Sequence, residues 1–108
     1  MNLPDKIIQL TSARCHIRDK VPRAELLAQL AEEATELAHA ALKLRRALEA
    51  TKNPTPVSVP TAVAATREEI ADVMLLVSLL ELDTAKDELQ EIIDFKTLRW
   101  EGRLKERR

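Results

Sequence analysis

With 108 residues, a formal net charge of −1 and 45% hydrophobic residues, the chain has the size of one domain with a limited core, spanning residues 1–108. Aromatic residues make up only 2% of it. Because strands favour aromatic and β-branched side chains, this composition argues against a sheet protein and predicts an all-α fold. The near-zero net charge argues against recruitment to nucleic acid or to an anionic membrane surface.

The sequence also predicts a soluble, cytoplasmic protein. Residues 1–10 are polar and lack the apolar segment of a signal peptide. The longest apolar run, residues 73–80, is far shorter than the roughly 20 residues that span a bilayer. Cys15 is the single cysteine, so an intrachain disulfide is impossible and a reducing compartment is the simplest location.

The first half of the chain predicts two helices. Residues 4–14 form the first helix, with Pro4 in its first turn, and residues 15–21 form a polar connection. Residues 22–50 form the second helix, because five leucines fall on one narrow stripe at about 100° per residue. These are Leu26, Leu30, Leu37, Leu44 and Leu48. Residues 51–60 hold three prolines and predict a long, mobile loop.

Residues 61–82 predict the third helix. Thr66 and Glu69 have the spacing of a capping box, so its regular part is expected to begin near Thr66. Residues 70–82 are apolar on almost every side, which predicts a helix that is buried all round. Since so small a chain cannot cover such a helix alone, we expect a second subunit to cover one face, in a homodimer or homotetramer.

Paired acids on the second and third helices carry the functional signal. Residues three apart project from the same side of a helix, so Glu33 pairs with Glu36. Glu69 and Asp72 pair in the same way on the third helix. Because Glu33 borders the leucine stripe and Asp72 has apolar neighbours, both pairs are expected to face the core. Four desolvated carboxylates repel one another, and a bound cation is the economical explanation.

The type of ligand selects the metal. Carboxylate oxygens suit hard cations, so we expect Mg²⁺, with Mn²⁺ as a possible substitute, rather than Zn²⁺. Since Mg²⁺ usually keeps positions open for water and phosphate oxygens, the site predicts a phosphorylated ligand. Glu36 and His39 form a Glu-x-x-His unit like those of ferritin-like di-iron bundles, which need a second such unit. Glu69-x-x-Asp72 has no histidine, so His39 is expected to be a surface residue.

The fourth predicted helix spans residues 83–105, with Asp83 as its N-cap. Its inner stripe turns from apolar to basic along the helix and consists of Ala85, Leu89, Ile92, Ile93, Lys96, Arg99 and Arg103. Basic residues that complement a helix C-terminus explain the last turn but not cations on an inner face. We therefore expect Lys96, Arg99 and Arg103 to meet an anion or the acidic site. The basic end of the chain then needs no nucleic acid to explain it.

These motifs resemble those of the MazG-like, all-α nucleoside triphosphate pyrophosphohydrolases, relatives of the dimeric dUTPases and dCTPases. The resemblance rests on Glu-Glu-x-x-Glu at residues 32–36 and on Glu-x-x-Asp at residues 69–72. The basic positions of residues 96–103 resemble the C-terminal helix of short, single-domain members. The resemblance covers roughly residues 24–103.

The resemblance implies a four-helix module that oligomerises, usually at least as a dimer. It implies Mg²⁺-dependent attack of water on the α-phosphorus of a nucleoside triphosphate, with release of pyrophosphate. The implied metal ligands are Glu33, Glu36, Glu69 and Asp72. The implied triphosphate clamp consists of Lys96, Arg99 and Arg103. Glu32 is the spare acid, able to orient or deprotonate the water. The first helix offers no aromatic residue to stack on a base.

A non-catalytic helical module for oligomerisation or interaction is the competing prediction. It requires the inward acidic and basic positions to pair with each other, without a metal. Added Mg²⁺ would then leave the melting temperature unchanged, whereas an empty metal site would gain several degrees.

Overall fold

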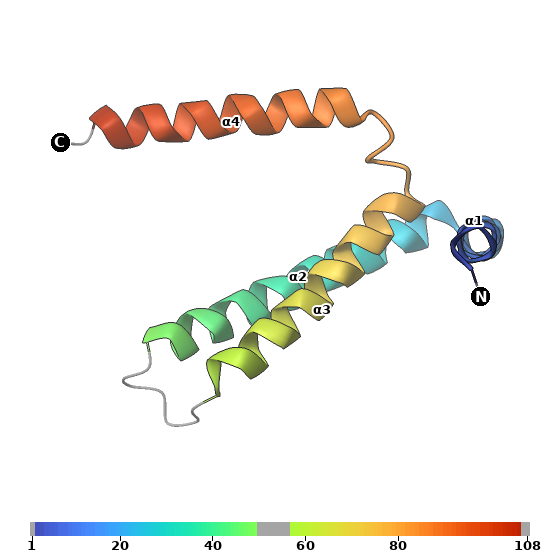
Figure 1. Cartoon of the computed structure of the whole chain (residues 1–108), viewed down its shortest axis with the longest axis horizontal. Helices are drawn as coiled ribbons and strands as arrows, with labels where there is room; N and C mark the ends of the chain where they lie inside the picture. The colour runs from blue at the N-terminus through green and yellow to red at the C-terminus, as the bar shows by residue number, and fades with distance from the viewer. Residues whose placement is uncertain (1, 50–56, 107–108) are drawn as a thin grey trace.

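Four helices contain most of the residues that the structure, a computed structural model, describes, which are residues 2–49 and 57–106 (Figure 1). In chain order they are α1 (Leu3–Lys20), α2 (Arg23–Glu49), α3 (Val59–Leu79) and α4 (Lys86–Glu106). No residue in the described ranges belongs to a strand, so the predicted all-α class is confirmed for them. Within the same ranges, no helix has both the length and the apolar character needed to cross a membrane.

The end of α1 differs from the prediction. The polar connection predicted for residues 15–21 is wrong, because α1 continues to Lys20. Residues 15–20 contain neither glycine nor proline, so their polarity reflects an exposed helix rather than a break. The helix ends at Val21, whose backbone is extended (φ −107°, ψ 120°), since the ring of Pro22 disfavours helical geometry in the residue before it. The bounds predicted for the second helix agree closely with those of α2.

The start of α3 also differs from the prediction. Ser58 is the N-cap, and its side-chain oxygen accepts a hydrogen bond from the backbone N–H of Thr61 at 3.3 Å. Pro60 lies in the first turn, where its missing N–H has no cost. The hydroxyl of Thr66 donates to the carbonyl oxygen of Ala62 at 2.8 Å, inside the helix. The capping box predicted at Thr66 is therefore wrong.

Two other predictions concern connections. Asp83 is not the N-cap of α4, because the carbonyl oxygen of Ala85 accepts the first helical hydrogen bond, from the N–H of Leu89 at 3.0 Å. Of the loop predicted for residues 51–60, most lies outside the described residues. The last part of that range, from Val59, belongs to α3.

α2 and α3 form an antiparallel hairpin, and α1 crosses the end at which α2 begins and α3 ends (Figure 1). The core lies at this crossing and consists of Leu26, Leu76, Leu79 and Leu80. Ile17 of α1 and Val21 cover part of it. Towards the other end of the hairpin, Ala40 and Ala62 are buried, and these small side chains let the two helices approach closely. The core therefore fixes α1 against the same hairpin that carries the acids.

α3 is buried on one face only, contrary to the prediction that it is buried all round. Leu76 and Leu79 face the core, whereas Ile70, Met74 and Leu75 are exposed, Met74 to 65%. The reason is geometric, since α2 runs along one side of α3 and cannot contact the other side. The subunit expected to cover that apolar side stays a prediction.

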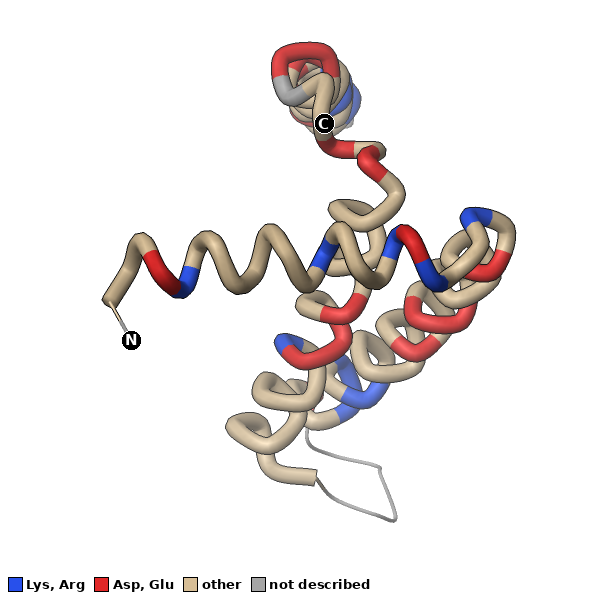
Figure 2. Tube along the Cα trace, turned by 90° about the vertical axis from the view of Figure 1, so that its right-hand side faces the viewer, with Lys and Arg blue, Asp and Glu red and all other residues tan. Residues whose placement is uncertain are grey.

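α4 stands apart from the hairpin, as Figures 1 and 2 show from two directions. From residue 87 to residue 106, every residue except Gly102 is exposed. The inner stripe predicted for this helix therefore has no core to face within one chain. Its separation makes the molecule extended, with a radius of gyration of 18.3 Å against about 13 Å for a compact domain of this size.

Candidate metal centre

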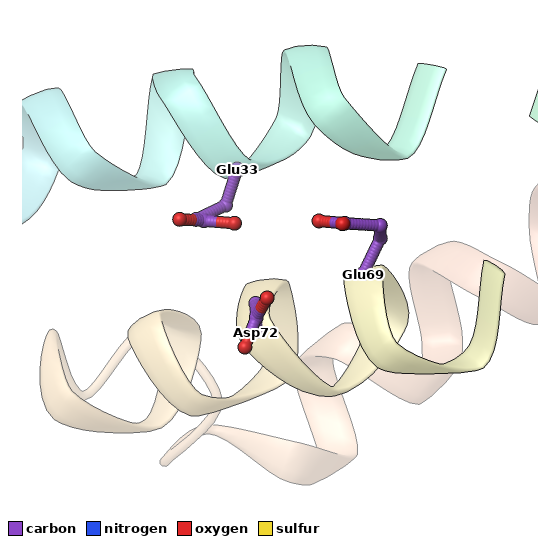
Figure 3. A group of neighbouring side chains, drawn as sticks. All are labelled: Glu33, Glu69 and Asp72. Carbon is purple, nitrogen blue, oxygen red and sulfur yellow. The ribbon is translucent and has the colours of Figure 1, made fainter. Parts of the chain in front are cut away.

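Three carboxylates converge between the two helices of the hairpin. Glu33 comes from α2, and Glu69 and Asp72 come from α3 (Figure 3). Each offers one oxygen atom, and these three oxygens lie within 4.8 Å of one another. Glu69 and Asp72 share a side of α3 because they are three residues apart, and Glu33 projects from the side of α2 that packs there. We call these three residues the acidic cluster.

Two other predicted site residues lie outside the acidic cluster. Glu36 is exposed, because it lies off the centre of the face that packs against α3, but its charge still reaches Glu33. Glu32 is also exposed and projects about 100° around the helix from Glu33. The prediction of four acids facing the core is corrected to three acids, of which Glu33 and Glu69 are half-buried and Asp72 is exposed.

The electrostatics of the acidic cluster are unfavourable without a cation. Burial raises the pKa of Glu33 above its ordinary value. The neighbouring negative charges of Asp72, Glu69 and Glu36 raise this pKa further, as does a hydrogen bond with Asp72. The Oε2 atom of Glu69 is buried and has no hydrogen-bond partner among the described residues. Because a buried carboxylate oxygen without a partner is costly, the cluster lacks a donor or a positive charge.

The donor atoms of the acidic cluster fit a hard divalent cation. None of the ion pairs within the described ranges involves its three residues. The donors are all carboxylate oxygens, which favour Mg²⁺ or Mn²⁺, and His39 is exposed, as predicted. Ligands on opposite sides of one Mg²⁺ lie about 4 Å apart. Small side-chain movements would therefore bring the three oxygens into one coordination sphere.

A cavity of about 240 Å³ opens beside the acidic cluster. Glu33 and Asp72 form part of its wall, and Gln29 adds an uncharged polar group. The rest of the wall is apolar and comes from α1, its C-cap, α2 and α3, through Ile17, Val21, Leu26, Leu75, Leu76 and Leu79. The sequence prediction missed this cavity because it placed residues 15–21 in a connection. One signal for the cavity was present in the sequence. Gln29 lies one helical turn before Glu33, so both side chains project from the same side of α2.

The predicted basic residues do not reach the acidic cluster within one chain. Lys96, Arg99 and Arg103 are all exposed on α4, which stands apart from α2 and α3 (Figure 1). The guanidinium of Arg99 lies 5.6 Å from the centroid of the Phe95 ring, in a cation–π contact within the helix. The reason for the separation is the turn after α3, which directs α4 away from the hairpin.

Comparison with known proteins identifies no relative. No family model matches the chain, and no curated protein or solved structure is significantly similar to it. The MazG-like resemblance therefore stays a prediction.

Proposed function

We propose that this chain hydrolyses a nucleoside or deoxynucleoside triphosphate to the monophosphate and pyrophosphate, and that the reaction requires Mg²⁺. The main support is the acidic cluster, whose oxygens lie within 4.8 Å of one another and have no ion-pair partner within the described ranges. A site made of carboxylates suits Mg²⁺, and protein-bound Mg²⁺ is commonly shared with substrate phosphates.

Each acid has a proposed role. Glu33, Glu69 and Asp72 are the metal ligands, and Glu36 is a fourth ligand that approaches from one turn further along α2. When bound, Mg²⁺ would neutralise phosphate charge and lower the pKa of a coordinated water. Glu32 stays the proposed residue that orients or deprotonates the attacking water, although its carboxylate lies outside the acidic cluster.

The cavity beside the acidic cluster is the proposed site for the base or the sugar. Its apolar walls suit the faces of a planar ring, and the amide of Gln29 can donate or accept a hydrogen bond at the ring edge. Apolar side chains would then contact the faces of the base, which is the role of a stacking aromatic residue in other nucleotide sites. A substrate placed here has its phosphates next to Glu33 and Asp72, which line the same cavity.

The proposal that water attacks the α-phosphorus has separate support. Release of pyrophosphate, rather than of inorganic phosphate, depends on the resemblance of residues 32–36 and 69–72 to MazG-like motifs. The test must therefore identify the product as well as its rate of formation.

The experiment is an assay of purified protein against the ordinary and damaged nucleoside triphosphates, with Mg²⁺ and with a chelator. We expect pyrophosphate and the monophosphate from at least one substrate, only when the metal is present. Asp72→Asn should abolish this activity without unfolding the protein, because it removes a ligand and a repulsive charge together. Glu91→Gln removes an exposed acid from α4 and is the control, with activity unchanged. Normal turnover by Asp72→Asn would exclude the proposed site.

A non-catalytic oligomerisation module is the second candidate, and the exposed apolar residues of α3 and α4 favour it. It requires the acids to pair with the cations of α4. No ion pair within the described part of one chain joins them, so such pairing would have to occur between chains. Binding of Mg²⁺ separates the two candidates, because a paired network does not gain stability from the ion.

A further inference from the structure

α1 forms one wall of the cavity beside the acidic cluster, but few of its residues attach it to the hairpin. None of its 18 residues is buried, and residues 3–13 are all exposed. Within α1, the half-buried residues are Arg14, Ile17 and Arg18. They share one side of the last two turns, because they are three and four residues apart. Figure 2 shows the N-terminal turns of α1 extending to one side of the hairpin.

The connection between α1 and α2 provides a single pivot. Val21 and Pro22 are the two residues between the helices, and the backbone of Val21 is extended. The N–H of Val21 donates to the carbonyl oxygen of Ile17 at 2.8 Å, so it belongs to the bonds of α1. The carbonyl oxygen of Pro22 accepts from the N–H of Leu26 at 3.1 Å, so it belongs to α2. Because the proline ring fixes φ of Pro22, a change in ψ of Val21 turns α1 as a unit and leaves both sets of bonds intact.

An ion pair joins α1 to the turn after α3. The guanidinium of Arg18 donates to the carboxylate of Glu81 at 3.1 Å. The other ion pairs within the described residues each lie inside one helix. The turn is itself attached to α2, because the guanidinium of Arg23 donates to the carbonyl oxygen of Leu80 at 3.3 Å. α1 is therefore bound to a turn that the hairpin holds in place.

The backbone of Glu81 indicates that its side chain has a role. Its φ of 57° is left-handed, and its N–H donates to the carbonyl oxygen of Ser78 at 3.0 Å. The N–H of Leu82 donates to the carbonyl oxygen of Val77 at 3.1 Å, which completes a Schellman motif. Glycine adopts this conformation with less strain than any residue with a β-carbon. The strained glutamate therefore points to a role for the carboxylate, and the contact with Arg18 supplies one.

The end of α1 that carries Arg18 also contacts the cavity. Ile17 and Val21 form the α1 side of the cavity wall and cover part of the leucine core. A planar ring bound in the cavity loses its contact with Ile17 when α1 turns away. Occupancy of the cavity and docking of α1 therefore favour each other, and each strengthens the other by the same factor.

We propose that α1 is a lid over this cavity, hinged at Val21 and closed by the ion pair between Arg18 and Glu81. When the lid opens, α1 turns about Val21, the ion pair breaks, and Ile17 leaves the cavity wall. The side chains of the pair are 31% and 58% exposed, and so exposed a pair changes an equilibrium by about five-fold at most. A closure of this strength is readily reversed, as entry and release of a ligand require.

The nature of the ligand rests on the proposed function, which places a base or a sugar in the cavity. The hinge and the ion pair do not rest on it. The lid is therefore tested first with a ligand that takes part in no reaction, and then with the substrate.

Indole is a suitable probe, because it is a neutral planar ring that matches the apolar walls of the cavity. Hydrogen exchange of the α1 amides reports on the lid, since an undocked helix of 18 residues is only marginally stable in water. We expect indole to shift the NMR signals of Leu76 and Leu79 and to slow exchange in α1, while exchange in α4 stays unchanged. Absence of indole binding would overturn the lid. Binding that shifts Leu76 and Leu79 but does not slow exchange in α1 would overturn it too.

Glu81→Gln tests the ion pair, because it removes the charge and keeps the size of the side chain. We expect exchange of the α1 amides to become about two- to five-fold faster and indole to bind more weakly by a similar factor. Combining Arg18→Glu with Glu81→Arg reverses the pair and should restore both values. Glu101→Gln is the matched control, because it removes an exposed ion pair inside α4, and it should change neither. Unchanged exchange in Glu81→Gln, or a loss that the reversed pair does not restore, would overturn the proposal.

Steady-state kinetics test whether the lid acts in the proposed reaction. A ligand held only under the closed lid binds in proportion to the closed fraction, so Glu81→Gln should raise KM by about two- to five-fold and leave kcat unchanged. A lower kcat with unchanged KM would contradict a lid. If the wild type releases no pyrophosphate from any nucleoside triphosphate, the proposed function fails, and the exchange measurements with indole still decide the lid.

Discussion

In α2, apolar residues at helical spacing pack against α3, whereas in α4 residues at the same spacing lie open to solvent. Leu26 of α2 is 3% exposed and Leu104 of α4 is 58% exposed, although both lie on the apolar side of an amphipathic helix. The charges differ in the same way, since three acids of the hairpin gather in one cluster, whereas Lys96 and Arg103 of α4 form no ion pair within the described residues. Helical periodicity thus identifies the face that needs a partner but does not say which chain supplies that partner.

The largest expected effect is on the free energy of unfolding, which should depend strongly on the hairpin core and little on α4. Leu80 is 1% exposed at the end of α3, so Leu80→Ala should lower the free energy of unfolding by about 2 to 5 kcal/mol. Leu98 is 69% exposed on the acidic side of α4, and Leu98→Ala should change it by less than about 0.5 kcal/mol. Chemical denaturation measures both. Equal losses would show that α4 is packed on all sides.

The next largest effect is on catalysis, and substitutions on the two sides of α4 should differ in it. Lys96→Ala should lower kcat/KM by about 10- to 100-fold, because a charged contact to phosphate is lost. Arg103→Ala should act mainly on KM. Lys105 pairs with Glu101 on the other side of the helix at 3.3 Å, and Lys105→Ala is the control that should change neither constant. A loss of kcat/KM from Lys105→Ala as large as the loss from Lys96→Ala would contradict the proposal that the Lys96 side of α4 contacts the phosphates.

Much of the hairpin could be predicted from the sequence because its signals are local. Glu69 and Asp72 are three residues apart on one helix, and Glu33 borders the leucine stripe, so their convergence follows from helical geometry. The exposure of Glu36 could not be predicted, since it depends on how far α3 is rotated against α2.

The position of α4 could not be predicted, because no local signal marks it. The left-handed residue that ends α3 is Glu81 rather than glycine, and its carboxylate is held by Arg18 from α1. Only the tertiary structure brings these two residues together. The cavity was missed for a similar reason, since Ile17 lies in a segment whose polarity predicted a connection.

A smaller effect tests the turn that sets α4 apart. Glu81→Gly and Glu81→Ala both remove the contact with Arg18, so they differ only in how well they tolerate the left-handed backbone. Glu81→Gly should be more stable than Glu81→Ala by about 1 kcal/mol. Thermal denaturation of the two variants measures this difference. Identical stabilities would show that the turn is not left-handed in solution.

The smallest effect is the dependence of the metal-free fold on pH. The pKa of Glu33 is raised in the folded state, first by burial and then by the charge of Asp72. Its contribution to stability is therefore complete below the ordinary value of 4.5 and is lost as the pH rises through the folded pKa. Glu33→Gln should raise the melting temperature slightly at neutral pH and leave it unchanged in acid. A lower melting temperature for Glu33→Gln at neutral pH would contradict this.

The most direct measurement of the central claim is a Mg²⁺ titration of the melting temperature, for the wild type and for Glu69→Gln. A ligand at about 100 times its dissociation constant adds about 2.7 kcal/mol to the stability of the fold, which is several degrees for a domain of this size. We predict that rise for the wild type with Mg²⁺ or Mn²⁺, and a much smaller rise for Glu69→Gln. No rise in the wild type, or equal rises in both proteins, would contradict a metal centre at Glu33, Glu69 and Asp72.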